Sequence, residues 1–518
     1  MKDNIRRFFQ VGAAITVMLL GSIGVQAEEA GSSAVVRVND DPRNINPLYV
    51  TDLNSFAIMQ SIYAPFFEIV DGEVYYGNGL LESVEANADS TVFTLKLKEG
   101  LTWHDGEAIS ADDIVFTMEV LVDPEQAVPY SSYGFIDDEA AVTEKVDERT
   151  ATITFSSSNT GFLGSLSQIY LIPKHIYEGV SKIGESELNY EPVGNGPYKF
   201  VSYDSGQSYV VEKFDGYFED NSKSLDSIVF KIIKDDNTAI AALQSGEVDV
   251  MTISSDQHPT VEALDSVTIY PYNSGQVNAL GMNLLTEPLN DVKVRQAISY
   301  ALNTEELITF AWSGLDYAEP AYSIFTPDTL YYDDSLTHYD NDTAKAKELL
   351  AEAGVSSLDL SLMYSSSSDW AEKAALYIQS KLAGVGINVT LNPQADTVFA
   401  NAVQEENSTK YNLVLNNWEL GAEPSLYADI ITIGSRSNYA HVADEELDAL
   451  WTKGLVTPDG EERAAIYSEI QNTINDQQYL HPLSYSNGFY AISNELTGFD
   501  DFLLQTIYLD YSRLQLAE

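Results

Sequence analysis

The chain has 518 residues, 44% of them hydrophobic, and a formal net charge of −52 at pH 7. Its length and apolar content allow a large buried core in roughly two to four domains and exclude a disordered chain. The negative charge disfavours nucleic acids and anionic lipids as partners; we expect it to serve solubility or tolerance of salt, with a preference for cationic or amine-bearing ligands as the alternative.

The N-terminus has the pattern of a secretory signal. Three basic residues among the first seven precede an apolar stretch at residues 11–25, and Ala27 places a small residue at the expected cleavage site. The stretch is shorter than the about 20 residues that a membrane-spanning helix needs. Residues 1–27 are therefore predicted to be a signal peptide that directs export, and retention as an uncleaved anchor is the alternative.

Strands and helices alternate through the first half of the chain. Ser110 and Asp113 have the spacing of a capping box, which predicts a helix from there through Leu121. Gly246 is expected to end another helix, at 237–245. Alternating or continuous apolar residues predict a further helix at 56–63 and strands at 34–38, 91–97, 150–155, 198–201, 208–212 and 248–251.

A second mixed section begins near residue 280. Apolar periodicity predicts helices and strands in turn, with helices at 292–302, 342–353 and 370–382 and strands at 358–363, 387–391 and 411–415. This repeated alternation is typical of an α/β fold. The sequence has no long proline- or serine-rich linker, so short crossings are predicted between domains.

The sequence carries none of the common catalytic or cofactor-binding motifs. There is no phosphate-binding glycine loop, no nucleophile elbow and no histidine pair at helical spacing. The chain also has no cysteine, which excludes disulfides, thiolate metal sites and a lipid-modified cysteine. Glu419 and Glu423 could serve two-carboxylate hydrolysis, but chance explains such a pair better in so acidic a chain. We therefore predict no enzyme, no cofactor and no metal site.

Several motifs resemble a known family of binding proteins. Residues 97–116, LKEGLTWHDGEAISADDIVF, resemble the signature region of the family 5 extracellular solute-binding proteins, the peptide and nickel binders of ABC importers. Further similar stretches follow in the family's order: GNGPYKF at 194–200, AALQSGEVD at 241–249 and NDVKVRQAI at 290–298. The resemblance runs from about Val35 to the C-terminus. Within the signature, Trp103 to Gly106 is interpreted as a structural turn and not as a site.

The resemblance implies an α/β protein of the two-lobed periplasmic-binding-protein type (type II, cluster C) with an extra subdomain inserted in the first lobe. The two lobes are expected to close on a ligand by hinge bending. The predicted division of the mature chain is lobe I at 28–60, 186–278 and 482–518, the inserted subdomain at 61–185, and lobe II at 279–481.

The resemblance also implies a ligand site. In peptide binders of the family, a tryptophan-containing segment carries an acid that pairs with the peptide α-ammonium group, and residues 416–424 resemble this segment. The usual aspartate before the acid-proline pair is missing and the segment is one residue shorter, so either Glu419 substitutes, with Glu423 as a structural acid, or the ligand lacks the amine. The predicted ligand contacts are Tyr49, Thr51, Asp52, Asn417, Trp418, Glu419, Glu423, Tyr485 and Asn487. Ordinary packing is the alternative for Trp418 and Tyr485.

The resemblance therefore predicts the extracellular binding component of an ABC importer. It would capture oligopeptides between its lobes and deliver them to the membrane permease. The alternatives are a receptor for an oligosaccharide or another polar solute, a secreted hydrolase, and a chaperone or adhesin of the cell envelope. The predicted partners are a small solute and the permease subunits, with no nucleic acid and with the protein as a monomer. The predicted location is periplasmic or cell-surface, without a cysteine-linked lipid.

Overall fold

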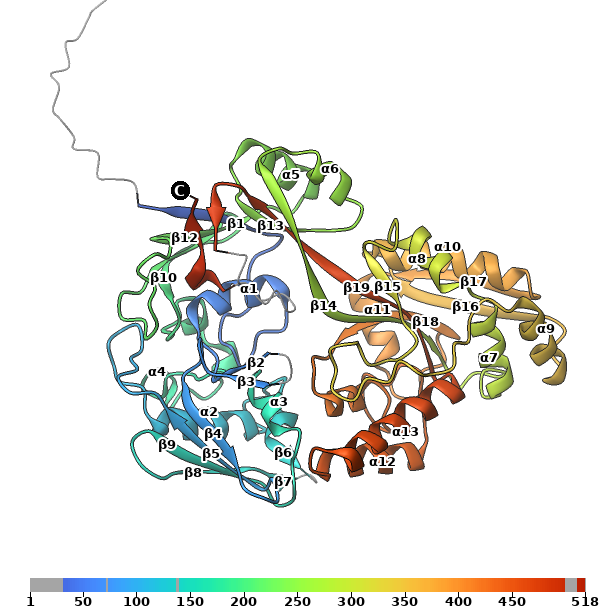
Figure 1. The fold of residues 1–518 in the computed structure, drawn as a ribbon, viewed down its shortest axis with the longest axis horizontal. Coiled ribbons are helices and arrows are strands. Elements are labelled where there is room, and N and C mark those ends of the chain that lie inside the picture. Colours follow the sequence, from blue (N-terminus) through green and yellow to red (C-terminus); the bar gives the residue numbers. More distant parts are fainter. Residues whose placement is uncertain (1–30, 71–72, 137–138, 499–509, 518) are drawn as a thin grey trace, which may run out of the picture.

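The computed structural model describes residues 31–70, 73–136, 139–498 and 510–517 and forms two lobes joined by two long strands (Figure 1). The predicted signal peptide at 1–27 lies outside the described residues. Strands β14 (Val267–Met282) and β19 (Leu480–Ser493) run antiparallel from one lobe into the other. They lie inside one continuous sheet with the order β10-β11-β12-β1-β13-β19-β14-β18-β16-β17.

The pairing of β14 with β19 is irregular where the strands pass between the lobes. Asn273 pairs with Asn487 and Gln276 pairs with Ser486, so two additional residues of β14 form a bulge. One of them, Gly275, has a φ of 63°, in the left-handed region that glycine adopts without strain. The bulge therefore marks a local change in strand direction between the lobes.

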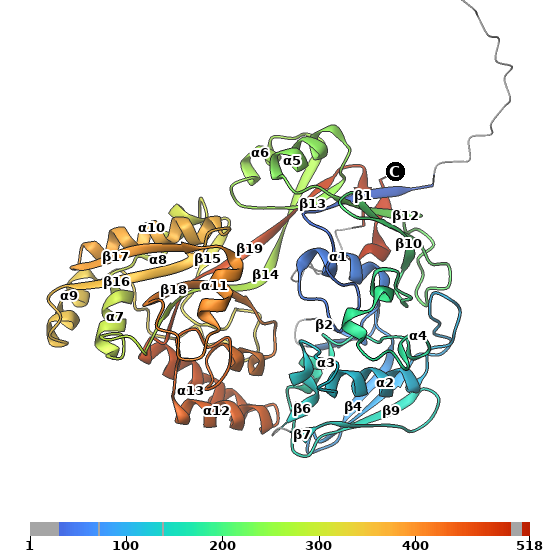
Figure 2. The ribbon, with the colours of Figure 1, turned by 180° about the vertical axis from the view of Figure 1, so that it is seen from behind.

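Lobe I contains the first half of the sheet and the helices that cover it. Its strands are β1 (Ser33–Val38), β10 (Tyr198–Asp204), β11 (Ser208–Lys213), β12 (Ser227–Ile232) and β13 (Val250–Ile253). Its helices are α1 (Leu53–Ile62), α5 (Asp236–Ser245) and α6 (His258–Glu262), and the short strands β20 (Leu496–Thr497) and β21 (Gln515–Leu516) pair near the C-terminus. In both ribbon views α1 lies on the side of lobe I that is turned towards lobe II (Figures 1 and 2).

Between α1 and β10 the chain forms a second unit, here called the insert. Its main sheet has the order β4-β5-β9-β8, formed by β4 (Leu81–Ala86), β5 (Val92–Leu97), β9 (Thr150–Thr154) and β8 (Val142–Lys145). Its other elements are β2 (Glu68–Val70), β3 (Glu73–Tyr75), α2 (Ala111–Val122), β6 (Phe135–Ile136), β7 (Glu139–Ala140), α3 (Phe162–Leu166) and α4 (Lys174–Tyr177). The predicted limits of the insert, 61–185, stay a prediction.

Lobe II contains the other end of the sheet. Its strands are β15 (Ala318–Pro320), β16 (Leu358–Ser365), β17 (Ile387–Gln394) and β18 (Leu413–Glu419). Its helices are α7 (Val292–Tyr300), α8 (Thr304–Ala311), α9 (Thr343–Glu352), α10 (Asp369–Ala383), α11 (Asp396–Val403), α12 (Glu445–Val456) and α13 (Glu461–Gln477), with a 3₁₀ helix, η4 (Pro424–Ile430), after β18. The predicted lobe boundaries at 278/279 and 481/482 fall within the two crossing strands.

Local sequence signals explain where several helices begin and end. Ser110 caps α2 by accepting a hydrogen bond from the Asp112 amide, and the Asp113 carboxylate accepts one from the Ser110 amide at 2.9 Å. This reciprocal arrangement is the predicted capping box. At the end of α5, Gly246 adopts a φ of 75°, as expected for a glycine that ends a helix.

The turn from Trp103 to Gly106 connects two of the sequence motifs. The backbone amide of His104 donates to the carbonyl of Gly194, and the Gly194 amide donates back to His104 Nδ1 at 3.1 Å. Trp103 is fully buried. Burial lowers the pKa of His104 to about 4, so the ring is neutral at pH 7. These contacts are structural, in agreement with the interpretation of this stretch as a turn.

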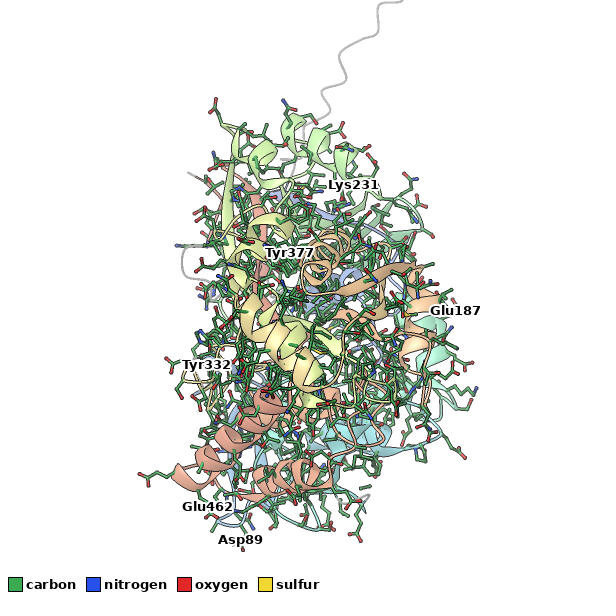
Figure 3. The ribbon with its side chains drawn as sticks, turned by 90° about the vertical axis from the view of Figure 1, so that its right-hand side faces the viewer. Asp89, Glu187, Lys231, Tyr332, Tyr377 and Glu462 are labelled. Carbon is green, nitrogen blue, oxygen red and sulfur yellow. The ribbon has the colours of Figure 1, made fainter. Side chains whose placement is uncertain are left out.

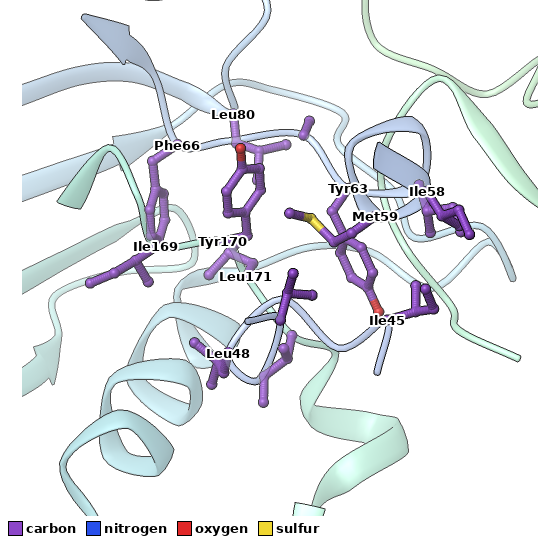
Figure 4. Packing of buried hydrophobic residues seen from close by; sticks show 14 of the residues in the cluster. Ile45, Leu48, Ile58, Met59, Tyr63, Phe66, Leu80, Ile169, Tyr170 and Leu171 are labelled. Atoms are coloured by element: carbon purple, nitrogen blue, oxygen red, sulfur yellow. The ribbon is translucent and has the colours of Figure 1, made fainter. Parts of the chain in front are cut away.

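Lobe I and the insert share one hydrophobic core. The same cluster of buried residues includes Val36 of β1, Ile58 of α1, Leu95 of β5 and Ile153 of β9. Figure 4 shows part of this cluster, where Met59, Tyr63 and Phe66 pack with Tyr170 and Leu171. Lobe II has separate clusters. Lobe I and the insert therefore form a single packed body.

The acidic residues lie mainly at the surface. Figure 3 labels Asp89, Glu187 and Glu462 at the periphery, and all three are exposed. Among the described residues, Asp113 and Glu423 are the only acidic residues that are buried as whole residues. None of the described helices is both long enough and apolar enough to cross a membrane.

The shared core gives a first testable expectation. The Phe66 side chain is fully buried, so Phe66→Ala should lower the free energy of unfolding by about 3–5 kcal/mol by leaving a cavity. Leu53 is 60% exposed, and Leu53→Ala should change it by less than about 0.5 kcal/mol. Urea denaturation followed by circular dichroism measures both; equal midpoints for the two variants would contradict the packing described.

Candidate functional site

The segment that resembles the family's ligand-binding region begins on β18, beside a crossing strand. Gln276 of β14 pairs with Glu419, and Val277 pairs with Trp418. The strand thus extends to Glu419, beyond the predicted end at Leu415. It is followed by Gly421, whose φ of 76° allows the chain to turn before η4.

Glu419 lies where β14 passes into lobe I. Its side chain is exposed to solvent, yet the surrounding protein raises the pKa of its carboxyl group to about 7, while a hydrogen bond from Gln276 acts in the opposite direction. Burial raises the pKa of Tyr272 to about 12, and the charge of Glu419 adds to this rise. Tyr272 packs against the core shared by lobe I and the insert. Water therefore reaches the Glu419 carboxyl group, although protein surrounds it.

A chain of polar side chains connects Glu419 to the interior of the crossing strands. Gln276 Nε2 donates to Glu419 Oε1 at 3.4 Å, and Gln276 Oε1 accepts from Ser486 Oγ at 2.8 Å. Ser486 Oγ in turn accepts from Asn278 Nδ2 at 2.7 Å. Asn417, which pairs with Asn278, is half-buried beside this chain. The Glu419 side chain is thereby linked to both crossing strands.

Trp418 points to the other face of the sheet, because neighbouring strand residues alternate. It is half-buried, packs against the cluster of Val277 and Tyr485, and its ring lies 5.8 Å from that of Tyr439. Trp418 and Glu419 therefore do not share one surface of β18. These packing contacts cover part of the Trp418 side chain, part of which stays exposed, and its contact with a ligand stays a prediction.

Glu423 is engaged in a buried ion pair. Its Oε1 accepts from Arg463 Nη2 at 2.6 Å, and the exposed fractions of the two side chains are 8% and 0%. Glu423 also caps η4 through the Ser425 amide. Burial lowers the pKa of Arg463, but the Glu423 carboxylate, with Tyr467 and Asp459, raises it overall. Glu423 is thus a structural acid, the role considered for it from the sequence, and its carboxylate is not free to act in hydrolysis.

The three predicted contacts from lobe I lie around the beginning of α1. Tyr49 donates from its hydroxyl group to the carbonyl of Gln126 at 3.1 Å and packs beside Gly184, so it joins lobe I to the insert. Asp52 caps α1 by accepting from the amide and hydroxyl of Ser55. Only Thr51 is exposed. Tyr49 and Asp52 therefore have structural roles, and ligand contact by this loop stays a prediction.

The two predicted contacts on β19 differ in their surroundings. Tyr485 is buried, and its hydroxyl group donates to the carbonyl of Ser323 at 2.9 Å. This is the packed tyrosine that was the alternative from the sequence. Asn487 is half-buried, and its backbone amide donates to the carbonyl of Tyr317. Of the predicted contacts on β18, Trp418 packs in the same cluster as Tyr485, with β14 between their two strands.

The described residues contain no group of three or more metal-binding side chains. His481 is buried, and burial lowers the pKa of its ring to about 4. His175 pairs with Asp105 at 2.8 Å on the insert. The histidines thus have local structural partners or lie in the core.

Sequence reasoning missed three residues of this region: Tyr272, Gln276 and Arg463. The stretch 267–282 contains a proline, a serine and glycines, which weakened the signal for a strand. The pairing of Arg463 with Glu423 joins positions 40 residues apart, for which a single sequence gives no signal.

The buried ion pair allows a sharp test. Arg463→Met should lower the free energy of unfolding by about 3–5 kcal/mol, because it leaves the Glu423 carboxylate buried without a partner. The double variant Glu423→Gln/Arg463→Met should recover most of this loss. Lys345→Met, which removes an exposed pair with Glu348, should leave the urea midpoint almost unchanged. If the double variant unfolds as readily as Arg463→Met in urea, charge burial is not the cause.

Comparison with known proteins identifies relatives over the whole chain. Residues 76–438 match the family model described as bacterial extracellular solute-binding proteins, family 5 Middle. The chain is 29% identical over 514 residues to the glutathione-binding protein GsiB of Pectobacterium atrosepticum, covering 96% of each chain.

Solved structures give the same result. The ABC transporter substrate-binding protein CtaP from Listeria monocytogenes is 36% identical with a TM-score of 0.90, covering 94% of this chain and 100% of CtaP. A putative peptide-binding protein AppA from Clostridium difficile is 32% identical with a TM-score of 0.86, covering 93% and 100%. The oligopeptide-binding protein AppA from Bacillus subtilis, in complex with a nonapeptide, is 24% identical with a TM-score of 0.77, covering 94% and 99%, and supports the fold alone.

Proposed function

This chain belongs to the family 5 bacterial extracellular solute-binding proteins, and from that membership we propose that it captures short peptides for an ABC importer. Proteins of this family are binding proteins and not enzymes. They bind small solutes in the periplasm or outside the cell and interact with membrane permeases. The chain is thus the substrate-binding component of an ABC importer, and the hydrolase considered from the sequence is wrong.

The peptide assignment rests on one observation, the surroundings of the Glu419 carboxyl group and its lack of an ion-pair partner among the described residues. No ion pair to Glu419 occurs among the residues that the structure describes, although water reaches its carboxyl group and protein surrounds it. A carboxylate in such a place gains most from a cationic hydrogen-bond donor brought by a ligand. The α-ammonium group of a peptide is such a donor, and Glu419 would replace the aspartate that the segment lacks.

Relatives support this choice of ligand. The name of one relative mentions glutathione, and a neighbour that is 32% identical is named a putative peptide-binding protein. Asn417, on the same face of β18 as Glu419, and the exposed Thr51 are the further contacts proposed from lobe II and lobe I. We expect the protein to act as a monomer when it delivers its ligand to the permease.

Peptide affinity should depend on pH through Glu419. Below pH 7 the carboxyl group becomes protonated while the peptide α-amine stays charged, so affinity should fall, by about tenfold in total between pH 7.5 and pH 5. Above pH 7 the carboxylate is ionised and this dependence should end. Isothermal titration calorimetry with a tetrapeptide between pH 5 and 7.5 measures the slope.

Glu419→Gln should remove this pH dependence and weaken binding roughly tenfold at pH 7.5, through loss of a charge-assisted hydrogen bond. Glu469→Gln on α13, an exposed acid, is the matched control and should bind as the wild type does. The same peptide with an acetylated N-terminus should lose affinity for the wild type but not for Glu419→Gln. Equal affinity of the wild type for the free and acetylated peptides would contradict the role of Glu419.

A receptor for an oligosaccharide is the second candidate. The half-exposed Trp418, next to Tyr439, offers an aromatic surface on which a sugar ring could stack. Thermal-shift measurements with peptides of two to six residues and with oligosaccharides separate the candidates. Peptides should raise the melting temperature. If only sugars raise it, the peptide assignment is wrong and the oligosaccharide receptor takes its place.

A further inference from the structure

The insert contacts lobe II at the end of the molecule opposite the crossing strands. In both ribbon views the insert lies beside the end of α12 of lobe II (Figures 1 and 2). The backbone amide and the hydroxyl group of Thr160 both donate to the carbonyl of Leu455, at 3.0 and 2.6 Å. Leu455 is in the last turn of α12, where the backbone carbonyls have no amide partner within the helix. The insert therefore caps a helix of the other lobe.

Two glycines allow the backbones to come this close. A Cβ atom on Gly161 would lie 2.5 Å from Ser425 Oγ, and one on Gly164 would lie 2.6 Å from Glu423 Cβ. Gly161 has a φ of −80°, and Gly164 lies within α3, so neither backbone conformation requires glycine. The proximity of lobe II is what excludes a side chain at these two positions.

The surface that receives α3 is held rigidly within lobe II. Glu423 is fixed by Arg463, and Arg463 Nη1 also donates to Asp459 at 2.6 Å. The guanidinium group of Arg463 lies over the rings of Tyr331 and Tyr467. Leu455 packs its side chain against the core of lobe I and the insert. Both sides of the contact are thus well packed.

We propose that this contact is a latch, formed by residues 160–164 and by Glu423, Ser425 and Leu455, that holds the two lobes together. Since lobe I and the insert share one core, a contact made by the insert fixes the position of the whole of lobe I. Glu423 follows Glu419 by four residues, so one short segment carries both the proposed ligand acid and the receiving surface of the latch. The effect of the latch on ligand retention rests on the proposed function, whereas its effect on the lobes does not.

A different contact joins the lobes beside the crossing strands. Lys373 of lobe II pairs with Asp256 of lobe I, and both side chains are partly exposed. Such a pair contributes little and is weakened by salt. The latch has hydrogen bonds to a helix end and close backbone packing, on a surface that a buried ion pair fixes within lobe II. It should therefore persist at high salt, and measurements in 1 M NaCl separate the two contacts.

Lobe separation can be measured directly because the chain has no cysteine. Spin labels on Asp89→Cys in the insert and Lys347→Cys in lobe II, both exposed, report the distance between the lobes by pulsed electron resonance. The latch variants are Gly161→Ala and Gly164→Ala, alone and together, and Thr160→Ala, which removes only the hydroxyl contact. Gln168→Ala, an exposed residue just after α3, is the matched control. Circular dichroism confirms that each variant is folded.

Without ligand and in 1 M NaCl, the double glycine variant should shift the label distances to longer values, Thr160→Ala should shift them less, and the control should match the wild type. If the population of the closed conformation falls to about one tenth of its wild-type value, the dissociation constant of a bound tetrapeptide should rise about tenfold. Unchanged label distances in the folded double variant would overturn the latch. If the distances shift but the wild type itself binds no peptide, the latch stands and the peptide assignment fails.

Discussion

The antiparallel pairing of β14 with β19 is the interaction on which the rest of the structure depends. Backbone hydrogen bonds join these strands from Val267–Ser493 in lobe I to Gly281–Leu480 in lobe II. Because both strands lie inside one sheet, each lobe completes its own part of that sheet around them. The insert has a separate sheet but shares its core with lobe I. The molecule therefore consists of two bodies joined by two strands, and the proposed ligand acid lies beside this junction.

Much of the secondary structure could be predicted from local sequence patterns. The capping box of Ser110 and Asp113 located α2, and alternating apolar residues located β5 and β9, because these signals lie within one element. Strand β14 was missed. It includes Pro271 and Gly275, which disfavour a strand when they are considered alone. It forms because β18 and β19 pair with it on both sides, and such pairing is a property of the whole fold.

The candidate site was predicted only as far as the family resemblance reached. The resemblance located the segment around Trp418 and offered Glu419 as a substitute acid. The structure places Glu419 opposite Gln276 with its side chain exposed. The state of Glu423 depends on Arg463, which lies in a different helix, and could not be decided from a single sequence. Side chains near a site on paired strands have partners that are distant in sequence, so local patterns do not identify them.

The bulge in β14 has a consequence for the path along which the lobes approach each other. Extra residues on one strand of a pair increase its right-handed twist and bend it. Here the extra residues lie between Asn273 and Gln276, at the point where the chain leaves one lobe for the other. Lobe II is therefore expected to turn about the axis of the crossing strands while it tilts towards lobe I. The two lobes would then enclose a bound molecule by a rotation combined with a tilt, and not by simple hinge bending alone.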